Sequence, residues 1–264
     1  MQATGSQKAA PIEVANRLFR ERYPEAQVIF LAGSAARNQT DAFSDLDLLV
    51  IFSRLPNAYR ESFVFMDWPV EVFVHDFETL KYFFLDDVPS GNPATLRMVT
   101  EGIEIPGASP VSRSIRDLAS SILSAGPLPF ADDEEQRFRY MISSIITDIK
   151  KPRSHEELMA AGVNLYEKVG YYFFRSRGIW GNAGKLLPRT MSQAEPEFAR
   201  QFNEAFVALF GGNPEKVIRL VADLFAPRGG LLFDGYHYDA PHVWRTPLRS
   251  DKSDDNQKLT TGSR

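Results

Sequence analysis

Apolar residues recur along the chain with two different spacings, and the balance between them changes near the middle. Spacings of three and four residues in the first part predict helices over 11–22, 77–87 and 94–101. Between and after these helices, short apolar runs predict strands over 27–32, 46–52, 69–75 and 103–105. Residues 34–40 are polar enough for a turn or a single helical turn. The first part of the chain is therefore expected to mix strands and helices.

Beyond residue 111 the pattern is helical throughout. Helices are predicted over 112–124, 132–151, 155–177, 195–210 and 214–225. Pro127 and Pro129 mark a break between the two patterns. We therefore expect an α+β fold, with a mixed-sheet domain over 1–126 followed by a helical bundle over 127–245. The polar segment 246–264 is expected to be a disordered tail.

Composition narrows the class of protein without identifying it. The 264 residues are 44% hydrophobic and 24% charged, as in ordinary globular proteins. A net charge of −4 makes long nucleic acid an unexpected partner, although a local basic groove stays open. With no cysteine, disulfides and thiolate metal sites are excluded. No signal peptide or membrane-spanning run is recognisable, so we expect a cytoplasmic protein.

The segment 31–50 combines a glycine–serine turn with two aspartates. Gly33 ends an apolar run and lacks a side chain, so a ligand can approach its backbone closely. Ser34 then opens a turn whose hydroxyl and backbone N–H groups can bind phosphate oxygens. Arg37, one turn further on, is placed either to contact phosphate or to form a surface salt bridge. A phosphate-binding turn is the prediction.

Asp45 and Asp47 are separated by one residue in an expected strand, so their carboxylates leave the same face. Two neighbouring carboxylates repel each other unless a cation lies between them. Oxygen ligands beside phosphate suit Mg²⁺, and a pair of ions about 4 Å apart suits phosphoryl chemistry. Glu71, a charged residue among the apolar residues 70–74, is a candidate third ligand or a general base. The sequence leaves that choice open.

Gly33–Ser34, a spacer, Asp45-x-Asp47 and the later Glu71 together resemble the signature of the DNA polymerase β-like nucleotidyltransferase superfamily. The stretch 33–47 is most similar to the minimal and the aminoglycoside nucleotidyltransferases. The resemblance implies that the turn holds a nucleoside triphosphate and that the three acids bind Mg²⁺ or act as base. Ser44, directly before the aspartates, joins the nucleotide-binding candidates. The family often has glycine where this chain has Asn38; because asparagine tolerates positive φ best among other residues, we expect the turn to persist.

Outside the motif, the segment 177–185 resembles an aromatic-then-lysine stretch in related helical domains. There the lysine can reach the triphosphate, which makes Lys185 a candidate. A P-loop interpretation of 181–185 fails because Leu186 occupies the position that requires serine or threonine. Glu157 and Glu167, on expected helices, are candidate acceptor-side carboxylates or solvated residues.

These observations predict a magnesium-dependent enzyme whose site lies between its two parts. It would transfer a nucleotide, with ATP the expected donor, onto a hydroxyl of a small molecule of the aminoglycoside type. Two alternatives stay open: nucleotidylation of a protein or RNA, and a catalytically silent nucleotide-binding regulator. An acidic wall opposite the aspartates would favour a cationic acceptor, and a basic wall would favour RNA.

Overall fold

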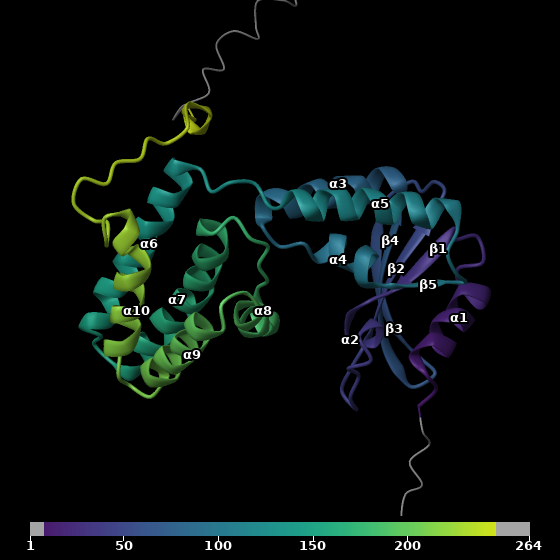
Figure 1. The fold of residues 1–264 in the computed structure, drawn as a ribbon, viewed down its shortest axis with the longest axis horizontal. Coiled ribbons are helices and arrows are strands. Elements are labelled where there is room, and N and C mark those ends of the chain that lie inside the picture. Colours follow the sequence, from purple (N-terminus) through teal and green to yellow (C-terminus); the bar gives the residue numbers. More distant parts are fainter. Residues whose placement is uncertain (1–7, 247–264) are drawn as a thin grey trace, which may run out of the picture.

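A five-stranded mixed sheet forms the centre of the amino-terminal half in the computed structural model, which describes residues 8–246 (Figure 1). The strand order is β3-β4-β2-β1-β5. β2 and β4 are parallel, and every other neighbouring pair is antiparallel. The strands are β1 (Val28–Leu31), β2 (Leu46–Phe52), β3 (Tyr59–Phe65), β4 (Trp68–Asp76) and β5 (Ile103–Ile105).

Helices cover both faces of this sheet. They are α1 (Pro11–Glu21), the short α2 (Gly33–Ala36), α3 (Phe77–Ser90), α4 (Ala94–Glu101) and α5 (Pro110–Ala125). Alternate residues of β2 and β4, such as Leu48 and Val72, pack toward α1 in one apolar cluster. The intervening residues, such as Leu49, pack with α3, α4 and α5 in a second cluster. Two filled layers therefore hold the central strands rigidly.

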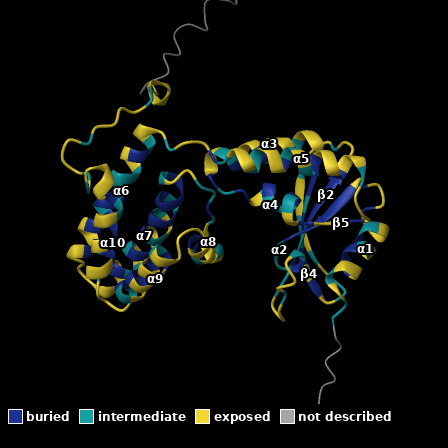
Figure 2. Cartoon of the chain, viewed as in Figure 1, coloured by how far each residue is buried: buried dark blue, intermediate teal, exposed yellow. Residues whose placement is uncertain are grey.

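The carboxy-terminal half is helical. It contains α6 (Asp132–Lys150), α7 (His155–Ser176), α8 (Leu187–Ala194), α9 (Pro196–Phe210) and α10 (Glu215–Phe225), with three short 3-10 turns η1 (Gly184–Leu186), η2 (Ala226–Arg228) and η3 (His242–Trp244). Its helices bury their apolar stripes against one another (Figure 2), in a cluster whose fully buried members all lie between 142 and 225. Among the described residues, no helix has the length and apolar character needed to cross a membrane.

The predicted α+β class is confirmed, and most predicted elements begin and end within a few residues of those observed. Two elements were missed. Strand β3 joins β4 through Met66 and Asp67, both at positive φ, instead of the usual asparagine–glycine pair. Helix α8 has only eight residues and begins with proline in its first turn.

The buried members of each core cluster come from one side of residue 126. Trp180 is the exception among partly buried residues, because it packs on the cluster of α3, α4 and α5 from the helical half. We keep the boundary as a proposal. The predicted tail, apart from Thr246, lies outside the described residues.

Candidate active site

Three carboxylates meet at the amino-terminal ends of the parallel strands β2 and β4. The parallel register pairs Asp47 directly with Glu71. Asp45 immediately precedes β2, two residues before Asp47. One oxygen from each of the three side chains can be chosen so that all lie within 4.8 Å of one another. The structure therefore brings together the acids that the sequence singled out, and their oxygens form a ligand set suited to a hard divalent cation.

Gly33 lies against the carboxylate of Asp47. Its φ is +62°, and a Cβ atom added there would fall 2.0 Å from Asp47 Oδ2. The backbone N–H of the preceding Ala32 donates to the Asp47 carbonyl oxygen at 2.8 Å. Only glycine permits this approach, because any side chain would displace the carboxylate. The turn and the acid are thus one packed unit.

The rest of the turn follows the expected course. Asn38 has a φ of +53°, as expected from its place where relatives carry glycine. The Gln39 N–H donates to the Ser34 carbonyl oxygen at 2.9 Å and closes the turn after α2. Ser44, by contrast, lies in the following loop: its hydroxyl donates to Asp41 Oδ1 at 3.0 Å and accepts from the Asp41 N–H at 2.8 Å. In this state the Ser44 hydroxyl shapes the loop.

Asp47 has an environment that opposes its negative charge. Burial, followed by the charges of Asp45 and Glu71, raises the pKa of the Asp47 carboxyl, while Lys185 and Arg37 act in the opposite direction. A partly buried acid with two acidic neighbours is stabilised by a cation placed among them. The donor chemistry and this unbalanced charge both fit magnesium.

Glu71 also has a partner from the protein. Its Oε2 accepts from Nη2 of Arg60 on β3 at 2.7 Å, and its side chain is 33% exposed. This pair could not be predicted from the sequence pattern, because β3 was not predicted. Arg60 and a bound cation would share the same carboxylate, so this ion pair bears on whether Glu71 is a metal ligand.

Residues 12–86 match the model of the nucleotidyltransferase domain family, a segment that contains the turn and all three acids. The chain carries a nucleotidyltransferase domain. This confirms the resemblance to the DNA polymerase β-like superfamily, and the general activity is nucleotidyl transfer. Among solved structures, the chain is similar to a nucleotidyltransferase-like protein from Exiguobacterium sibiricum 255-15, with 12% identity, coverage of 82% of this chain and 80% of that one, and a TM-score of 0.37. No protein of curated function matches it.

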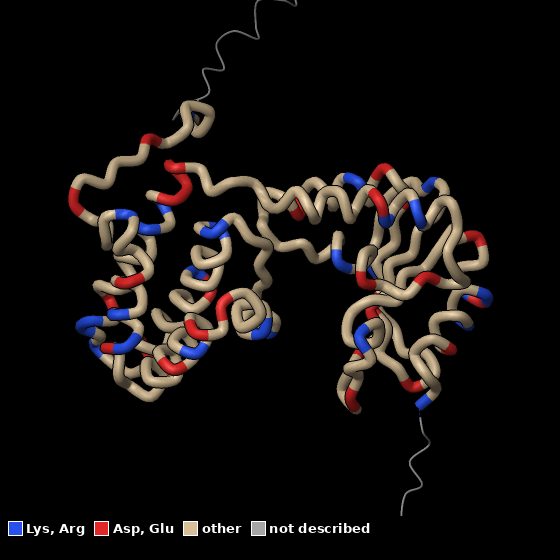
Figure 3. The backbone as a smooth tube through the Cα atoms, in the orientation of Figure 1, with Lys and Arg blue, Asp and Glu red and all other residues tan. Residues whose placement is uncertain are grey.

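Helix α8 and the segment before it lie on the side of the helical half nearest the nucleotidyltransferase domain (Figures 1 and 3), and together they contain Lys185 and Arg189. Lys185 is far from Asp47 in the sequence, but it lies close enough in the fold for its positive charge to oppose the rise in the pKa of Asp47. Arg189 Nη1 on α8 donates to Gln39 Oε1 at 3.2 Å, just beyond the glycine–serine turn. Arg37 forms an exposed salt bridge with Glu101 on α4 at 3.3 Å. The segment 183–194 contains no acidic residue, so this wall of the site is basic.

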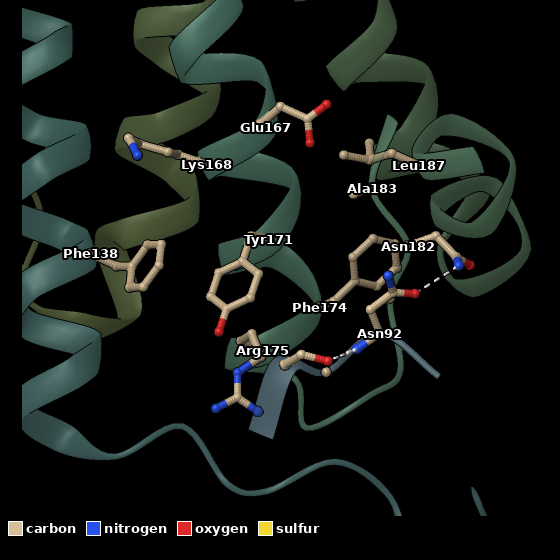
Figure 4. Close-up of a pocket in the computed structure, with 13 residues that line it drawn as sticks. Asn92, Phe138, Glu167, Lys168, Tyr171, Phe174, Arg175, Asn182, Ala183 and Leu187 are labelled. Atoms are coloured by element: carbon tan, nitrogen blue, oxygen red, sulfur yellow. Dashed lines mark hydrogen bonds between the residues drawn. The ribbon is translucent and has the colours of Figure 1, made fainter. Parts of the chain in front are cut away.

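A pocket of about 310 Å³ lies where the two halves meet (Figure 4). Its lining comes from residues 90–92, from α6 and α7, and from the loop 181–183. The aromatic side chains of Tyr171 and Phe174 and the carboxylate of Glu167 line it. The three acids of the site do not line it. Glu157 is elsewhere, at the start of α7, where it accepts from the Arg153 N–H at 3.0 Å.

Proposed function

We propose that this nucleotidyltransferase moves a nucleoside monophosphate from a triphosphate, with ATP the expected donor, onto a hydroxyl of a small-molecule acceptor of the aminoglycoside type. The observation that carries the proposal is the junction of Asp45, Asp47 and Glu71 with the Gly33 turn, opposite Lys185. The turn offers backbone N–H groups to phosphate, and Lys185 offers a positive charge. A cytoplasmic location belongs to the same proposal.

The proposed reaction is a displacement at the α-phosphorus. The acceptor oxygen forms a bond to phosphorus, the bond to the β-phosphate bridging oxygen breaks, and pyrophosphate leaves with that electron pair. The hydroxyl proton passes to a carboxylate, for which Glu71 is the candidate. Lys185 and Arg37, whose positive charges act on Asp47, would favour the negative leaving group.

Asp45, Asp47 and Glu71 are the residues that would hold magnesium. Bound there, one or two ions would neutralise phosphate charge and orient the triphosphate for in-line attack. The protein's own contribution is to fix the carboxylates in place. Gly33 does this for Asp47, because its backbone packs on that side chain.

The pocket at the junction supports a small acceptor. Its volume is of the order of known small-molecule sites, and aromatic rings with a few polar groups line it. The charged residues that line it are Glu167, Lys168 and Arg175, so an acceptor there would meet groups of both signs. The loop that forms one wall of the pocket, 181–183, leads directly into Lys185.

A second candidate, transfer to RNA or to a protein, is favoured by a different observation. The charge of Lys185 acts on Asp47, and Arg189 donates to Gln39 just beyond the turn. The segment 183–194 that carries both contains no acidic residue. Such a wall attracts phosphate, whether it belongs to the donor or to an RNA acceptor. Charge alone does not separate these two uses, so the choice belongs to experiment.

The test is incubation with α-phosphate-labelled ATP, Mg²⁺ and separate acceptors: an aminoglycoside panel, RNA and protein. Label on an aminoglycoside is expected; label on RNA or protein would favour the second candidate. Asp47→Asn is the matched control, because it keeps the side chain's shape and removes its charge. Absence of label from every acceptor, with nucleotide still bound, would identify a silent regulator instead.

A further inference from the structure

Three consecutive residues of the helical half are anchored to the amino-terminal half. Trp180 Nε1 donates to the Leu123 carbonyl oxygen on α5 at 2.7 Å, and its ring packs on the cluster of α3, α4 and α5. The Gly181 N–H donates to the Gly91 carbonyl oxygen at 2.8 Å. A Cβ on Gly181 would lie 2.5 Å from the Phe174 ring, so only glycine fits at this point of the loop. The loop before Lys185 is therefore held on the opposite half.

Asn182 completes this anchor with hydrogen bonds in three directions. Its Oδ1 accepts from Arg97 Nη1 on α4 at 2.8 Å and from Thr190 Oγ1 on α8 at 2.7 Å. Its Nδ2 donates to Asn92 Oδ1 at 3.2 Å, the bond drawn in Figure 4. One amide thus joins α4, the segment before it, and α8. Few side chains other than asparagine accept two bonds and donate a third from so short a stem.

The contacts continue from Asn182 to the glycine–serine turn. Arg97 Nε lies 3.7 Å from Glu101 Oε1, and Glu101 Oε2 lies 3.3 Å from Arg37 Nη1. Lys185 follows Asn182 by three residues. Lys185 and Arg37 are also the two cations whose charges act on the Asp47 carboxylate. Both therefore depend on the same network, one through the chain and one through ion pairs.

We propose, building on the nucleotidyltransferase function above, that Asn182 is a positioning residue that holds Lys185 and Arg37 beside the acidic site for binding of the triphosphate. A lysine on an exposed loop loses considerable side-chain and backbone freedom when it binds phosphate. Anchoring the loop before the ligand arrives reduces that loss. Asn182 acts through its neighbours and does not itself touch the nucleotide.

The first test needs no nucleotide. The chain has no cysteine, so Gln39→Cys with Arg189→Cys introduces the only two thiols, at a contact between the halves. The rate of cross-linking by a short bismaleimide reports how the halves are held.

Asn182→Leu removes all three hydrogen bonds at similar size and is expected to slow cross-linking at least about threefold. Asn182→Asp keeps the acceptor for Arg97 and Thr190 and should restore much of the rate. Asn203→Leu, at an exposed position on α9, is the control.

The second test measures nucleotide use. Asn182→Leu is expected to raise the KM for ATP about tenfold, with a much smaller change in kcat, because it weakens binding of the triphosphate. In a Lys185→Met background the same substitution should add less than about threefold, since only its weaker effect, through the exposed ion pairs to Arg37, remains. A residue that only supports the fold would have the same effect in both backgrounds.

Two results would overturn the proposal: unchanged cross-linking in Asn182→Leu, or equal effects of that substitution with and without Lys185. If the unsubstituted protein transfers no nucleotide to any acceptor, the proposed function fails by itself. The cross-linking rates would still decide whether Asn182 holds the two halves in place.

Discussion

Gly33 is the residue at which backbone conformation and site chemistry are most tightly joined. Gly33→Ala places a methyl group where the Asp47 carboxylate lies and also puts alanine at a φ of +62°. Displacing a ligand by about 1 Å can reduce turnover on the order of a hundredfold, and we expect a loss of that size in kcat/KM for transfer. Steady-state kinetics and thermal unfolding of the variant measure the two effects.

Gly178→Ala separates the two causes. Its φ is +63°, but nothing lies within 4 Å of the added Cβ. It should therefore lose about 1 kcal/mol of stability from the left-handed conformation and keep its activity. Equal activity losses in both variants would show that the conformation, and not the contact with Asp47, matters.

Asp47 permits a prediction with the opposite sign for stability and activity. Because the pKa of Asp47 is raised, the folded state binds its proton more tightly than the unfolded chain does, and ionisation costs stability at neutral pH. Asp47→Asn should therefore abolish transfer while raising Tm by about 2–4 °C at neutral pH in a chelator. The gain should shrink as pH falls through the folded pKa and vanish below about 4, where the acid is protonated in both states.

Magnesium provides the control for that experiment. It should raise the Tm of the unsubstituted protein, because the ion binds the folded state alone, and leave Asp47→Asn nearly unchanged. A lower Tm for Asp47→Asn in chelator would mean that the carboxylate stabilises the fold in some other way, and would count against the metal assignment.

At the scale of elements, the sequence was most informative where one strand or helix suffices. The apolar runs at 46–52 and 103–105 define β2 and β5 to the residue, since buried strands need continuous apolar side chains. Glu71 was recognisable as a charge among apolar neighbours. Its pairing with Asp47, however, depends on the parallel register of β2 and β4, which no local pattern specifies.

The hairpin of β3 and β4 pairs Arg60 with Glu71, and this ion pair provides a test of whether Glu71 is a metal ligand or a general base. Arg60→Met removes the 57% exposed guanidinium that pairs with Glu71 and retains apolar cover over Phe73. If Glu71 is a metal ligand, the Mg²⁺ concentration for half-maximal activity should fall by up to about fivefold, because an exposed ion pair is worth roughly 0–1 kcal/mol.

Arg54→Met is the comparison, since it removes an exposed positive charge at the opposite end of β2 and β4, where Phe52 pairs with Asp76. If Arg60→Met leaves the magnesium requirement unchanged and shifts only the pH dependence of kcat, Glu71 serves as the base and not as a ligand.

At the scale of the whole molecule, the contacts between the halves were beyond the reach of sequence. Lys185 was proposed from a resemblance, but Arg97, Arg189 and Asn182 carry no motif, and their partners lie far away along the chain. The segment between α5 and α6 makes contacts of the same kind. The Leu128 N–H donates to the Val88 carbonyl oxygen at 3.2 Å, and the Leu128 carbonyl oxygen accepts from Arg175 Nη1 at 2.5 Å. Such pairings follow from how the two cores are placed.

Trp180 should therefore determine whether the halves unfold together. It donates to Leu123 and covers the cluster of α3, α4 and α5, so Trp180→Ala removes both a hydrogen bond and apolar contact, at a cost of about 2–3 kcal/mol for a partly buried ring. We expect calorimetry to show one transition for the unsubstituted protein and two for Trp180→Ala, because each half keeps its own core. Trp180→Phe keeps most of the packing and should remain close to one transition. Trp244→Ala changes a residue that is 68% exposed, so its unfolding should not differ from that of the unsubstituted protein. A single unshifted transition in Trp180→Ala would mean that the linker and the Asn182 contacts are enough to couple the two cores.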